Sequence, residues 1–359
     1  MAEKGFDGTA VVLSEGAFAG TEGKTAHGLV RHTERYRVLA VIDSGLAGRD
    51  AGEVLDGRPA GIPIVADLDQ AIRTAGYRPD YLVVGVATHG GVLPPALRPA
   101  IRQALSLGIH VDSGLHELLG DDPEFSALAK SRHARIRDVR RTPPREAMHA
   151  FTGRILEVTS VRLAVLGTDS GVGKRTTSVR VVQGLNAAGC RAVLVGTGQT
   201  SWMQGARYGL IMDSLVNDFV SGEIEHQVLR AFREERPGVI VVEGQGCLTH
   251  PAYPGGFEIL AGARPDAIVL QHAPARAHYD GFPDFPLAGV EREMEVIGLL
   301  SGKPVVAITL NHEGLKPEEI RAHADVFRRR HGIPCCDPLV DGVGSIVEEL
   351  RHRFPRLPG

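Results

Sequence analysis

Near its middle the chain reads Leu163-Ala-Val-Leu-Gly-Thr-Asp-Ser-Gly-Val-Gly-Lys-Arg-Thr-Thr177, an apolar run that enters a glycine-rich turn and leaves it through a lysine. We expect residues 161–166 to form a buried strand and the two threonines to open a helix. Glycines in the turn allow the backbone to direct its N–H groups inward toward an anion. Lys174 adds a mobile cation, and the helix contributes the positive end of its dipole. This order predicts a phosphate-binding P-loop.

The turn departs from the usual P-loop pattern in two respects. Five residues separate Gly167 from Gly173, whereas the usual spacing is four. Arg175 follows the lysine, at the position of the usual serine or threonine that binds a phosphate-bound Mg²⁺. We therefore expect the metal-binding hydroxyl to move to Thr176. The alternative interpretation is an ordinary tight turn between a strand and a helix. The predicted phosphate-binding residues are Gly167, Thr168, Asp169, Ser170, Gly171, Val172, Gly173, Lys174, Arg175 and Thr176.

The length of 359 residues exceeds what one hydrophobic core usually serves, so we expect two domains. Pro143-Pro144 interrupts both regular periodicities and marks the join. We therefore place a Rossmann-like domain at residues 1–140 and a P-loop nucleotide-binding-like domain at residues 141–359.

The composition excludes several classes of protein. A net charge of −3 argues against a general nucleic-acid binder, whose surface would be basic. The four cysteines are too few and too irregularly spaced for a disulfide framework or a zinc site. The start lacks the apolar core of a signal peptide, and no apolar run reaches membrane-spanning length. We expect a cytoplasmic protein that does not bind a membrane, and a homo-oligomer.

Both halves alternate apolar strands with helical spacing, which predicts two doubly wound α/β domains with parallel sheets. The expected strands cover residues 9–13, 36–42, 81–86, 108–111, 161–166, 191–195, 239–242, 267–270 and 305–309, and the expected helices cover 24–32, 68–75, 95–107, 175–188, 223–235, 290–300 and 317–330.

The turn after the first strand is also rich in glycine and ends in Gly23-Lys24-Thr25. Asp43 closes the second strand, roughly where a dinucleotide-binding fold places its ribose-binding acid. The turn is not a clean G-x-G-x-x-G. We therefore expect a Rossmann-like domain whose first turn is structural, with a bound dinucleotide as the alternative.

Chemistry in such sheets lies at the carboxyl ends of the strands. Glu243 follows a strand of valines and fits the second residue of a magnesium site, or a base. The alternative for this carboxylate is a helix cap.

Further polar residues follow other strands. Asp218 and His250 are candidate catalytic groups, as any acid or histidine near the sheet edge could take a proton. His272 and Asn311 occupy similar places, and each of these residues could equally be structural. The predicted catalytic residues are Glu243, His250 and Asp218, and the predicted metal ligands are Thr176 and Glu243.

The string Gly167-Thr-Asp-Ser170 followed by Val172-Gly-Lys174 resembles the P-loop of dethiobiotin synthetase and the cobyrinic-acid amidases. A broader resemblance, to the D-glutamate N-acetyltransferase family, formerly a domain of unknown function, covers nearly the whole chain. It is carried by residues 23–29 and 41–45, the P-loop, and residues 243–253. That family pairs a Rossmann-like N-terminal domain with a P-loop C-terminal domain.

The second resemblance implies an enzyme that moves an acetyl group from acetyl-CoA to the amine of a small amino acid such as D-glutamate. The P-loop would then hold phosphate groups of CoA. The P-loop itself suits ATP and Mg²⁺ as well, so an ATP-dependent carboxylate-activating ligase or kinase-like enzyme is the first alternative. A nucleotide-sensing switch protein is the second.

Overall fold

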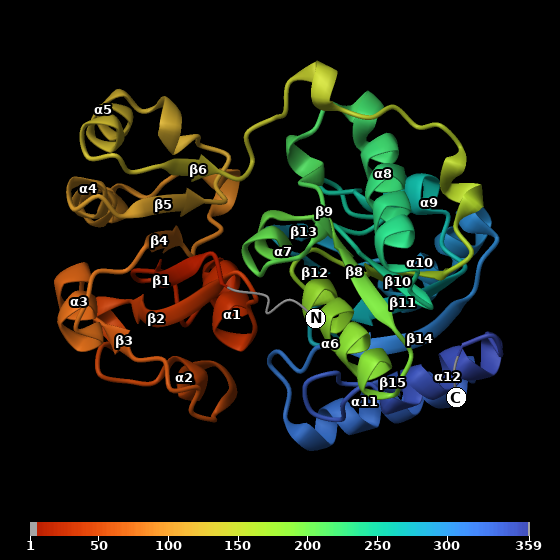
Figure 1. The fold of residues 1–359 in the computed structure, drawn as a ribbon. Helices are drawn as coiled ribbons and strands as arrows, with labels where there is room; N and C mark the ends of the chain where they lie inside the picture. Colours follow the sequence, from red (N-terminus) through yellow and green to blue (C-terminus); the bar gives the residue numbers. More distant parts are fainter. Residues whose placement is uncertain (1–5, 358–359) are drawn as a thin grey trace. The chain divides into compact units, whose positions relative to one another are not determined.

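A computed structural model describes residues 6–357 and divides the chain into two compact units, each built on a parallel sheet (Figure 1). The first unit holds the residues up to Thr142 together with Gln199–Ala206. The second holds Pro143–Gly198 and the residues from Arg207 onward. The prediction of two α/β domains is confirmed.

The first unit contains a six-stranded sheet in the order β3-β2-β1-β4-β5-β6. All its strand pairs are parallel, and the order is that of a Rossmann fold. The strands are β1 (Gly8–Leu13), β2 (Tyr36–Ile42), β3 (Ile64–Val65), β4 (Tyr81–Val84), β5 (His110–Ser113) and β6 (Ile136–Asp138).

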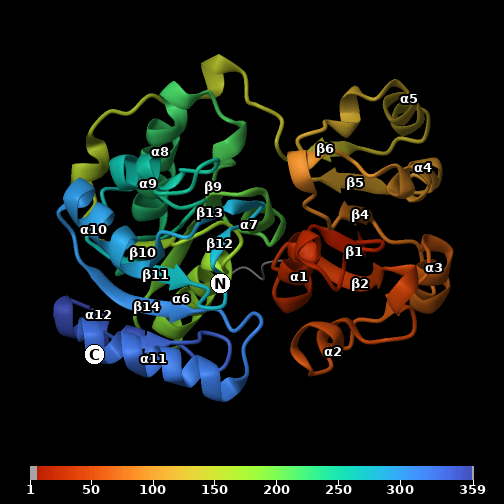
Figure 2. The same cartoon turned by 180° about the vertical axis from the view of Figure 1, so that it is seen from behind.

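Helices cover both faces of this sheet because alternate strand residues point to opposite sides. Val11 and Leu13 of β1 pack in the cluster formed with α3, α4 and α5, whereas Ala10 and Val12 pack with α1, α2 and α7. Figure 2 shows the unit from behind. The helices are α1 (Lys24–Arg31), α2 (Ala51–Asp56), α3 (Leu68–Ala75), α4 (Arg98–Ser106), α5 (Pro123–Ser131) and α7 (Gln199–Met203).

Helix α7 reaches the first unit from far along the chain, and its contacts there are specific. The Trp202 ring lies under the guanidinium of Arg35, at 3.9 Å from its carbon to the ring centroid. Gln204 Nε2 donates to the carbonyl oxygens of Gly28 and His32 at 2.7 and 2.8 Å. Met203 is fully buried in the core of this unit. The segment Gln199–Ala206 is therefore an integral part of the Rossmann-like unit.

The second unit contains a seven-stranded sheet in the order β15-β14-β11-β7-β10-β8-β9, with parallel pairing throughout. Strand β7 lies in the centre. A separate antiparallel hairpin joins β12 to β13. The strands are β7 (Val161–Gly167), β8 (Ala192–Gly196), β9 (Tyr208–Gly209), β10 (Val239–Glu243), β11 (Ala267–His272), β12 (His278–Tyr279), β13 (Phe282–Pro286), β14 (Val305–Leu310) and β15 (Cys335–Cys336).

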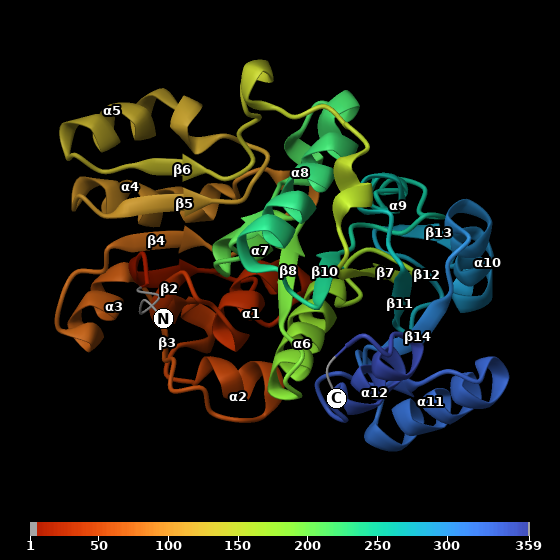
Figure 3. The ribbon, with the colours of Figure 1, turned by 45° about the vertical axis from the view of Figure 1, so that its right-hand side comes forward.

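The helices of the second unit also form two layers. Helices α6 and α12 pack on one face through a cluster that includes Val181 and Ile346 (Figure 3). Helices α8 to α11 pack on the other through a cluster that includes Ile224 and Phe327. The helices are α6 (Lys174–Ala187), α8 (Asn217–Glu235), α9 (Gly256–Ala263), α10 (Gly289–Ser301), α11 (Pro317–His331) and α12 (Gly344–Arg353).

The segment after the predicted join is fixed to helix α8 by two buried glutamates. Glu223 Oε1 accepts a hydrogen bond from the His149 N–H at 2.6 Å. Glu225 accepts the N–H groups of Thr152 and Ile155 at 2.6 and 2.9 Å. The residues after the double proline thus belong to the second unit.

Each of the four cysteines is buried and carries a free thiol. Between residues 6 and 357, no helix combines the length and the apolarity needed to cross a membrane.

Candidate functional site

The turn between β7 and α6 forms a cradle of backbone N–H groups. Gly171 and Gly173 adopt positive φ angles of 65° and 108°, which L side chains rarely adopt. Among the described residues, none accepts a hydrogen bond from the N–H groups of Gly171, Val172 or Gly173. Successive unpaired N–H groups at a helix N-terminus are the donors that bind phosphate oxygens.

Lys174 is the first residue of α6, and its side chain folds back over the turn. Its Nζ donates to the carbonyl oxygen of Asp169 at 2.6 Å. Burial is the largest influence on this ammonium and lowers its pKa to about 8, although Cys247, Asp169 and Glu243 oppose the shift. The lysine is thus held beside the N–H groups, where a bound anion would favour its charged form.

Asp169 anchors the turn from inside. Its carboxylate is fully buried and accepts Arg276 Nη1 at 2.9 Å and the N–H groups of Ser170 and Asp280 at 2.7 and 3.1 Å. Burial alone would raise the pKa of this carboxyl, but the nearby His250 ring and hydrogen bonds from Arg276 and the Ser170 N–H bring it below its usual value. Asp169 is thus an ionised structural anchor of the loop.

His250 faces the same carboxylate, and hydrogen bonds to its ring define the tautomer. Its Nδ1 accepts the N–H groups of Ala252 and Tyr253, each at 3.0 Å, so that nitrogen carries no proton. The proton of the neutral ring is therefore on Nε2, which lies 3.3 Å from Asp169 Oδ1 but outside good hydrogen-bond alignment. In this geometry His250 is a donor toward Asp169.

Glu243 ends β10 beside the loop and is buried. Its Oε2 accepts the Thr197 N–H at 2.9 Å, and Thr197 Oγ1 donates to the Glu243 carbonyl oxygen at 3.0 Å. The next residue must be glycine, because a Cβ on Gly244 would lie 2.1 Å from the Val165 carbonyl oxygen and 3.0 Å from Lys174 Cδ. The lysine stem therefore passes across the strand end that carries the glutamate.

Residues at the carboxyl ends of β11 and β14 form hydrogen bonds with the loop and with the first turn of α6. Gln271 Oε1 accepts the hydroxyl groups of Thr177 and Thr309. Asn311 Nδ2 donates to the Val172 carbonyl oxygen at 3.0 Å. His272 Nδ1 is 2.8 Å from Thr168 Oγ1, and burial, with a smaller effect of His323, lowers the pKa of that ring to about 4. His272 and Asn311 thus have structural roles.

The segment after β10 is hydrogen-bonded to the buried side chains of Glu293 and Tyr279. Glu293 Oε1 accepts the Thr249 N–H at 3.0 Å and also its hydroxyl. Tyr279 Oη is 2.7 Å from the same hydroxyl oxygen. Burial, reinforced by Glu293, raises the pKa of the nearby Cys247 thiol to about 12. This thiol is therefore un-ionised at neutral pH.

The structure brings most of the residues selected from the sequence to the turn between β7 and α6 and to the neighbouring strand ends. Thr176 is half-buried in the first turn of α6, and Asp218 is exposed in the first turn of α8. Sequence reasoning missed Arg276, Gln271 and Thr197. Each ends a strand or follows one by a few residues, which is the signal that could have selected them.

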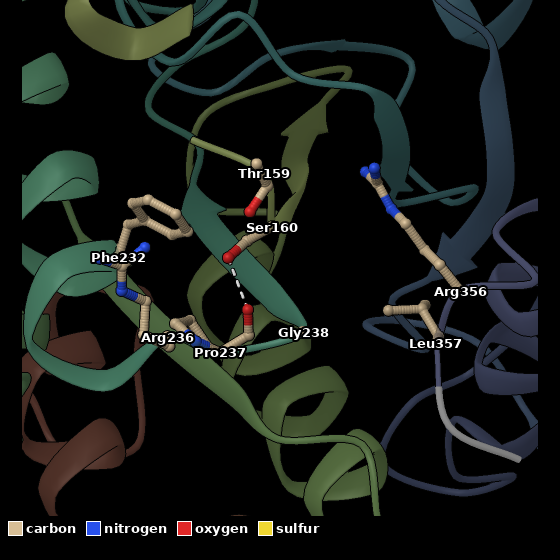
Figure 4. Close-up of a pocket in the computed structure, with 8 residues that line it drawn as sticks. All are labelled: Thr159, Ser160, Phe232, Arg236, Pro237, Gly238, Arg356 and Leu357. Atoms are coloured by element: carbon tan, nitrogen blue, oxygen red, sulfur yellow. Dashed lines mark hydrogen bonds between the residues drawn. The ribbon is translucent and has the colours of Figure 1, made fainter. Parts of the chain in front are cut away.

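A cavity of about 200 Å³ in the second unit lies elsewhere (Figure 4). Ser160 and Gly238, which immediately precede β7 and β10, are in its wall, and Ser160 Oγ donates to the Pro237 carbonyl oxygen at 2.5 Å. It therefore opens at the amino ends of the strands, away from the P-loop. Ligands of open α/β sheets bind at the carboxyl ends, so this cavity is not the candidate site.

Family models match both units. Residues 44–142 match the domain of unknown function DUF1611_N, described as Rossmann-like, and residues 149–347 match DUF1611_C, described as a P-loop domain. The chain belongs to the DUF1611 family. A crystal structure of a DUF1611 family protein from Anabaena variabilis is similar, with a TM-score of 0.87 at 27% identity over 96% of this chain and 99% of that one.

Two relatives carry the name D-glutamate N-acetyltransferase. One is from Tritonibacter scottomollicae and the other from a Pseudoalteromonas species. Each is 32% identical to this DUF1611 protein, over 275 and 274 residues respectively, which cover 75% of this chain and 80% of the relative. The resemblance found from the motifs is confirmed. The chain is an enzyme of a transferase family.

Proposed function

We propose that this protein transfers the acetyl group of acetyl-CoA to the amine of a small amino acid, with D-glutamate as the first candidate. The name of its two relatives carries the proposal, because the chain aligns with 80% of each. The P-loop with its unpaired N–H groups beside a buried carboxylate supports it.

The loop residues fit a diphosphate. Three consecutive N–H groups are unpaired within the described part of the chain, and Lys174 lies beside them. Backbone N–H groups and one lysine suffice to hold the oxygens of two linked phosphates. We assign residues 171–174 to the CoA diphosphate.

Glu243 is the proposed base. CoA supplies the acetyl group as a thioester, and the amine must lose a proton to attack its carbonyl carbon as the C–S bond breaks. A carboxylate held in one orientation by the Thr197 N–H can accept that proton. His250 lacks an available lone pair in this geometry, so we propose that it positions Asp169. Asp218 remains a predicted catalytic residue that mutation would test.

The test is an assay of the purified protein with acetyl-CoA and D-glutamate, without ATP or Mg²⁺, that follows release of the CoA thiol. We expect thiol release that requires the amino acid, and slower release with L-glutamate. Formation of ADP that the amino acid stimulates would favour the ligase instead. Slow ATP hydrolysis that no amino acid changes would favour the switch protein. Light scattering of the same sample tests the expected homo-oligomer.

A further inference from the structure

The carboxylate of Glu243 is held by the residue that follows β8. Glu243 Oε2 accepts the Thr197 N–H at 2.9 Å, and Thr197 Oγ1 donates to the Glu243 carbonyl oxygen at 3.0 Å. Gln245 Nε2 donates to the same hydroxyl oxygen, also at 3.0 Å. The orientation of this carboxylate therefore depends on where the chain lies as it leaves β8.

The chain passes from the second unit to the first immediately after Thr197. The boundary lies between Gly198 and Gln199, and Gln199 is the first residue of α7. The chain returns to the second unit between Ala206 and Arg207. One residue of extended chain spans at most about 3.6 Å, and only Gly198 separates Thr197 from the helix. Helix α7 therefore cannot shift far without displacing Thr197.

Helix α7 is held in place by its contacts in the first unit. It has five residues, too few for an isolated helix to be stable in water. Gln204 Nε2 donates to the carbonyl oxygens of Gly28 and His32, and the Gln204 carbonyl oxygen accepts the Glu34 N–H at 2.8 Å. The Trp202 ring packs under a guanidinium of the same unit. Without these contacts the segment would lose its fixed conformation.

The returning chain is bonded to the same end of β8. It enters β9, a strand of only two residues that pairs with β8. The Leu210 N–H then donates to the Gly196 carbonyl oxygen and the Met212 N–H to the Thr197 carbonyl oxygen, each at 3.0 Å. A segment that is fixed in the first unit is thus joined at both of its ends to the carboxyl end of β8.

We infer that the docking of Gln199–Ala206 in the Rossmann-like unit positions the Glu243 carboxylate through Thr197. The role of that carboxylate as the base rests on the proposed function. Gln204 and Trp202 are then positioning residues, since their own contacts lie within the first unit and they act on Glu243 through the chain. The first unit thus contributes to the reaction without a ligand of its own.

The test is steady-state kinetics of the full chain with Gln204→Met, which removes both side-chain hydrogen bonds and keeps a side chain of similar length. We expect kcat to fall about tenfold, because a small misplacement of a catalytic group is costly. The KM for acetyl-CoA should change less than about twofold, since the P-loop is untouched. Melting curves establish that each variant is folded, and Trp202→Leu serves if Gln204→Met is not.

Ile101→Val is the matched control in the same unit. It removes one buried methylene group from the core on the other face of the sheet, which also lowers stability. Its kcat should be normal, because it leaves the contacts of α7 intact.

Two further measurements separate positioning from a general loss of structure. In a Glu243→Gln protein, adding Gln204→Met should lower kcat by less than about twofold more, because the group that is positioned has already been replaced. Hydrogen exchange is followed by mass spectrometry of peptides that span residues 194–198. Exchange of the Thr197 N–H should be about tenfold faster with Gln204→Met, through local opening, and unchanged with Ile101→Val.

A folded Gln204→Met protein with normal kcat would overturn the inference. So would unchanged exchange at Thr197, an equal loss of kcat with Ile101→Val, or a full tenfold loss in the Glu243→Gln protein. Exchange needs no substrate and therefore separates the inference from the proposed function. Faster exchange at Thr197 in a protein that releases no thiol from acetyl-CoA would support the positioning of Glu243 and show that acetyl transfer is the wrong reaction.

Discussion

In each unit a glycine-rich turn follows a central strand, β1 in the first unit and β7 in the second. The two turns differ in what accepts the hydrogen bonds of their backbone N–H groups. In the first unit the turn after β1 uses them internally. Phe18 N–H donates to the buried Asp43 carboxylate at 3.1 Å, and those of Ala17, Gly20 and Gly23 donate to carbonyl oxygens within the turn. In the second unit the corresponding groups at Gly171, Val172 and Gly173 donate to no described residue.

Both turns end in Gly-Lys, so the dipeptide by itself does not make an anion site. Asp43, the candidate ribose ligand, instead closes the first turn through Phe18, which favours the structural interpretation of that turn. In the P-loop the carboxylate of Asp169 accepts only the Ser170 N–H from the turn and is otherwise bonded by Arg276 and Asp280, which leaves the N–H groups of residues 171–173 without an acceptor among the described residues. A turn binds anions when its own side chains leave the N–H groups unpaired.

Replacing the two lysines should give the largest difference between the turns. We expect Lys174→Ala to reduce kcat/KM for acetyl-CoA by about 1,000-fold, at the upper end of the loss of one preorganised donor. Lys24→Ala, in the exposed equivalent position, should change it less than about twofold, as surface substitutions usually do little. Steady-state kinetics with a melting curve for each variant test this. Equal losses from both variants would mean that the first turn also binds substrate.

Substitutions of the two buried acids, Glu243 and Asp43, should differ in their effects on catalysis and on stability. Glu243→Gln should lower kcat by about 100-fold if the carboxylate is the base, and leave the melting temperature nearly unchanged because an amide oxygen still accepts the Thr197 N–H.

Asp43→Ala is the matched change in the first unit. It leaves the Phe18 N–H without its partner and should lower the free energy of unfolding by about 1–3 kcal/mol with normal turnover. A Glu243→Gln protein that is less stable but fully active would show that Glu243, like Asp43, has a structural role and is not the base.

The pKa of Lys174 predicts how ligand binding depends on pH. Because burial lowers that pKa to about 8 in the ligand-free loop, the lysine is charged below pH 8 and neutral above it. A bound diphosphate favours the charged form and raises the pKa, so binding above pH 8 takes up a proton. We expect affinity for CoA to be constant from pH 6 to 7.5 and then to fall, approaching about tenfold per pH unit.

Calorimetry in buffers of different ionisation enthalpy measures this proton uptake directly. The Lys174→Ala protein is the control, since its residual affinity should lose this pH dependence. Unchanged affinity from pH 7 to 9.5 in the unmodified protein would place the lysine outside the anion site.

Alanine at one glycine of each turn should give the smallest effects. Gly16 and Gly171 have similar positive φ angles of 69° and 65°, so each substitution should cost about 1 kcal/mol of stability by chemical denaturation. Only Gly171→Ala should also raise the KM for acetyl-CoA, because its N–H belongs to the cradle. An equal rise in KM for Gly16→Ala would mean that the turn after β1 also contacts acetyl-CoA.

The sequence predicted the central strands well, since β1, β2, β7, β10, β11 and β14 are runs dominated by apolar residues, most of them buried. It missed the edge strands β3, β6, β9 and β15. These have two or three residues each, and pairing rather than local composition creates them. Helix α9 was also missed, because its glycines weaken the helical pattern, and α8 begins at Asn217, earlier than residue 223.

The sequence predicts those site residues that a short motif or the end of a strand marks along the chain. Lys174 and Glu243 were selected because a motif or a strand end marked them. The Arg276 contact with Asp169 spans 107 positions, and it depends on β11 lying next to β7. Similarly, Thr197 contacts Glu243 because β8 neighbours β10. Strand order determines these pairs, and one sequence does not reveal it.

The docking of Gln199–Ala206 in the first unit has a consequence for how the protein is made. The Rossmann-like core lacks Trp202 and Met203 until the ribosome has synthesised β7, α6 and β8 of the following unit. Domains that fold in order during synthesis normally finish one before the next begins. Here the nascent first unit must wait, with the apolar surface under α7 uncovered, so a messenger truncated after codon 142 would encode a product prone to aggregate.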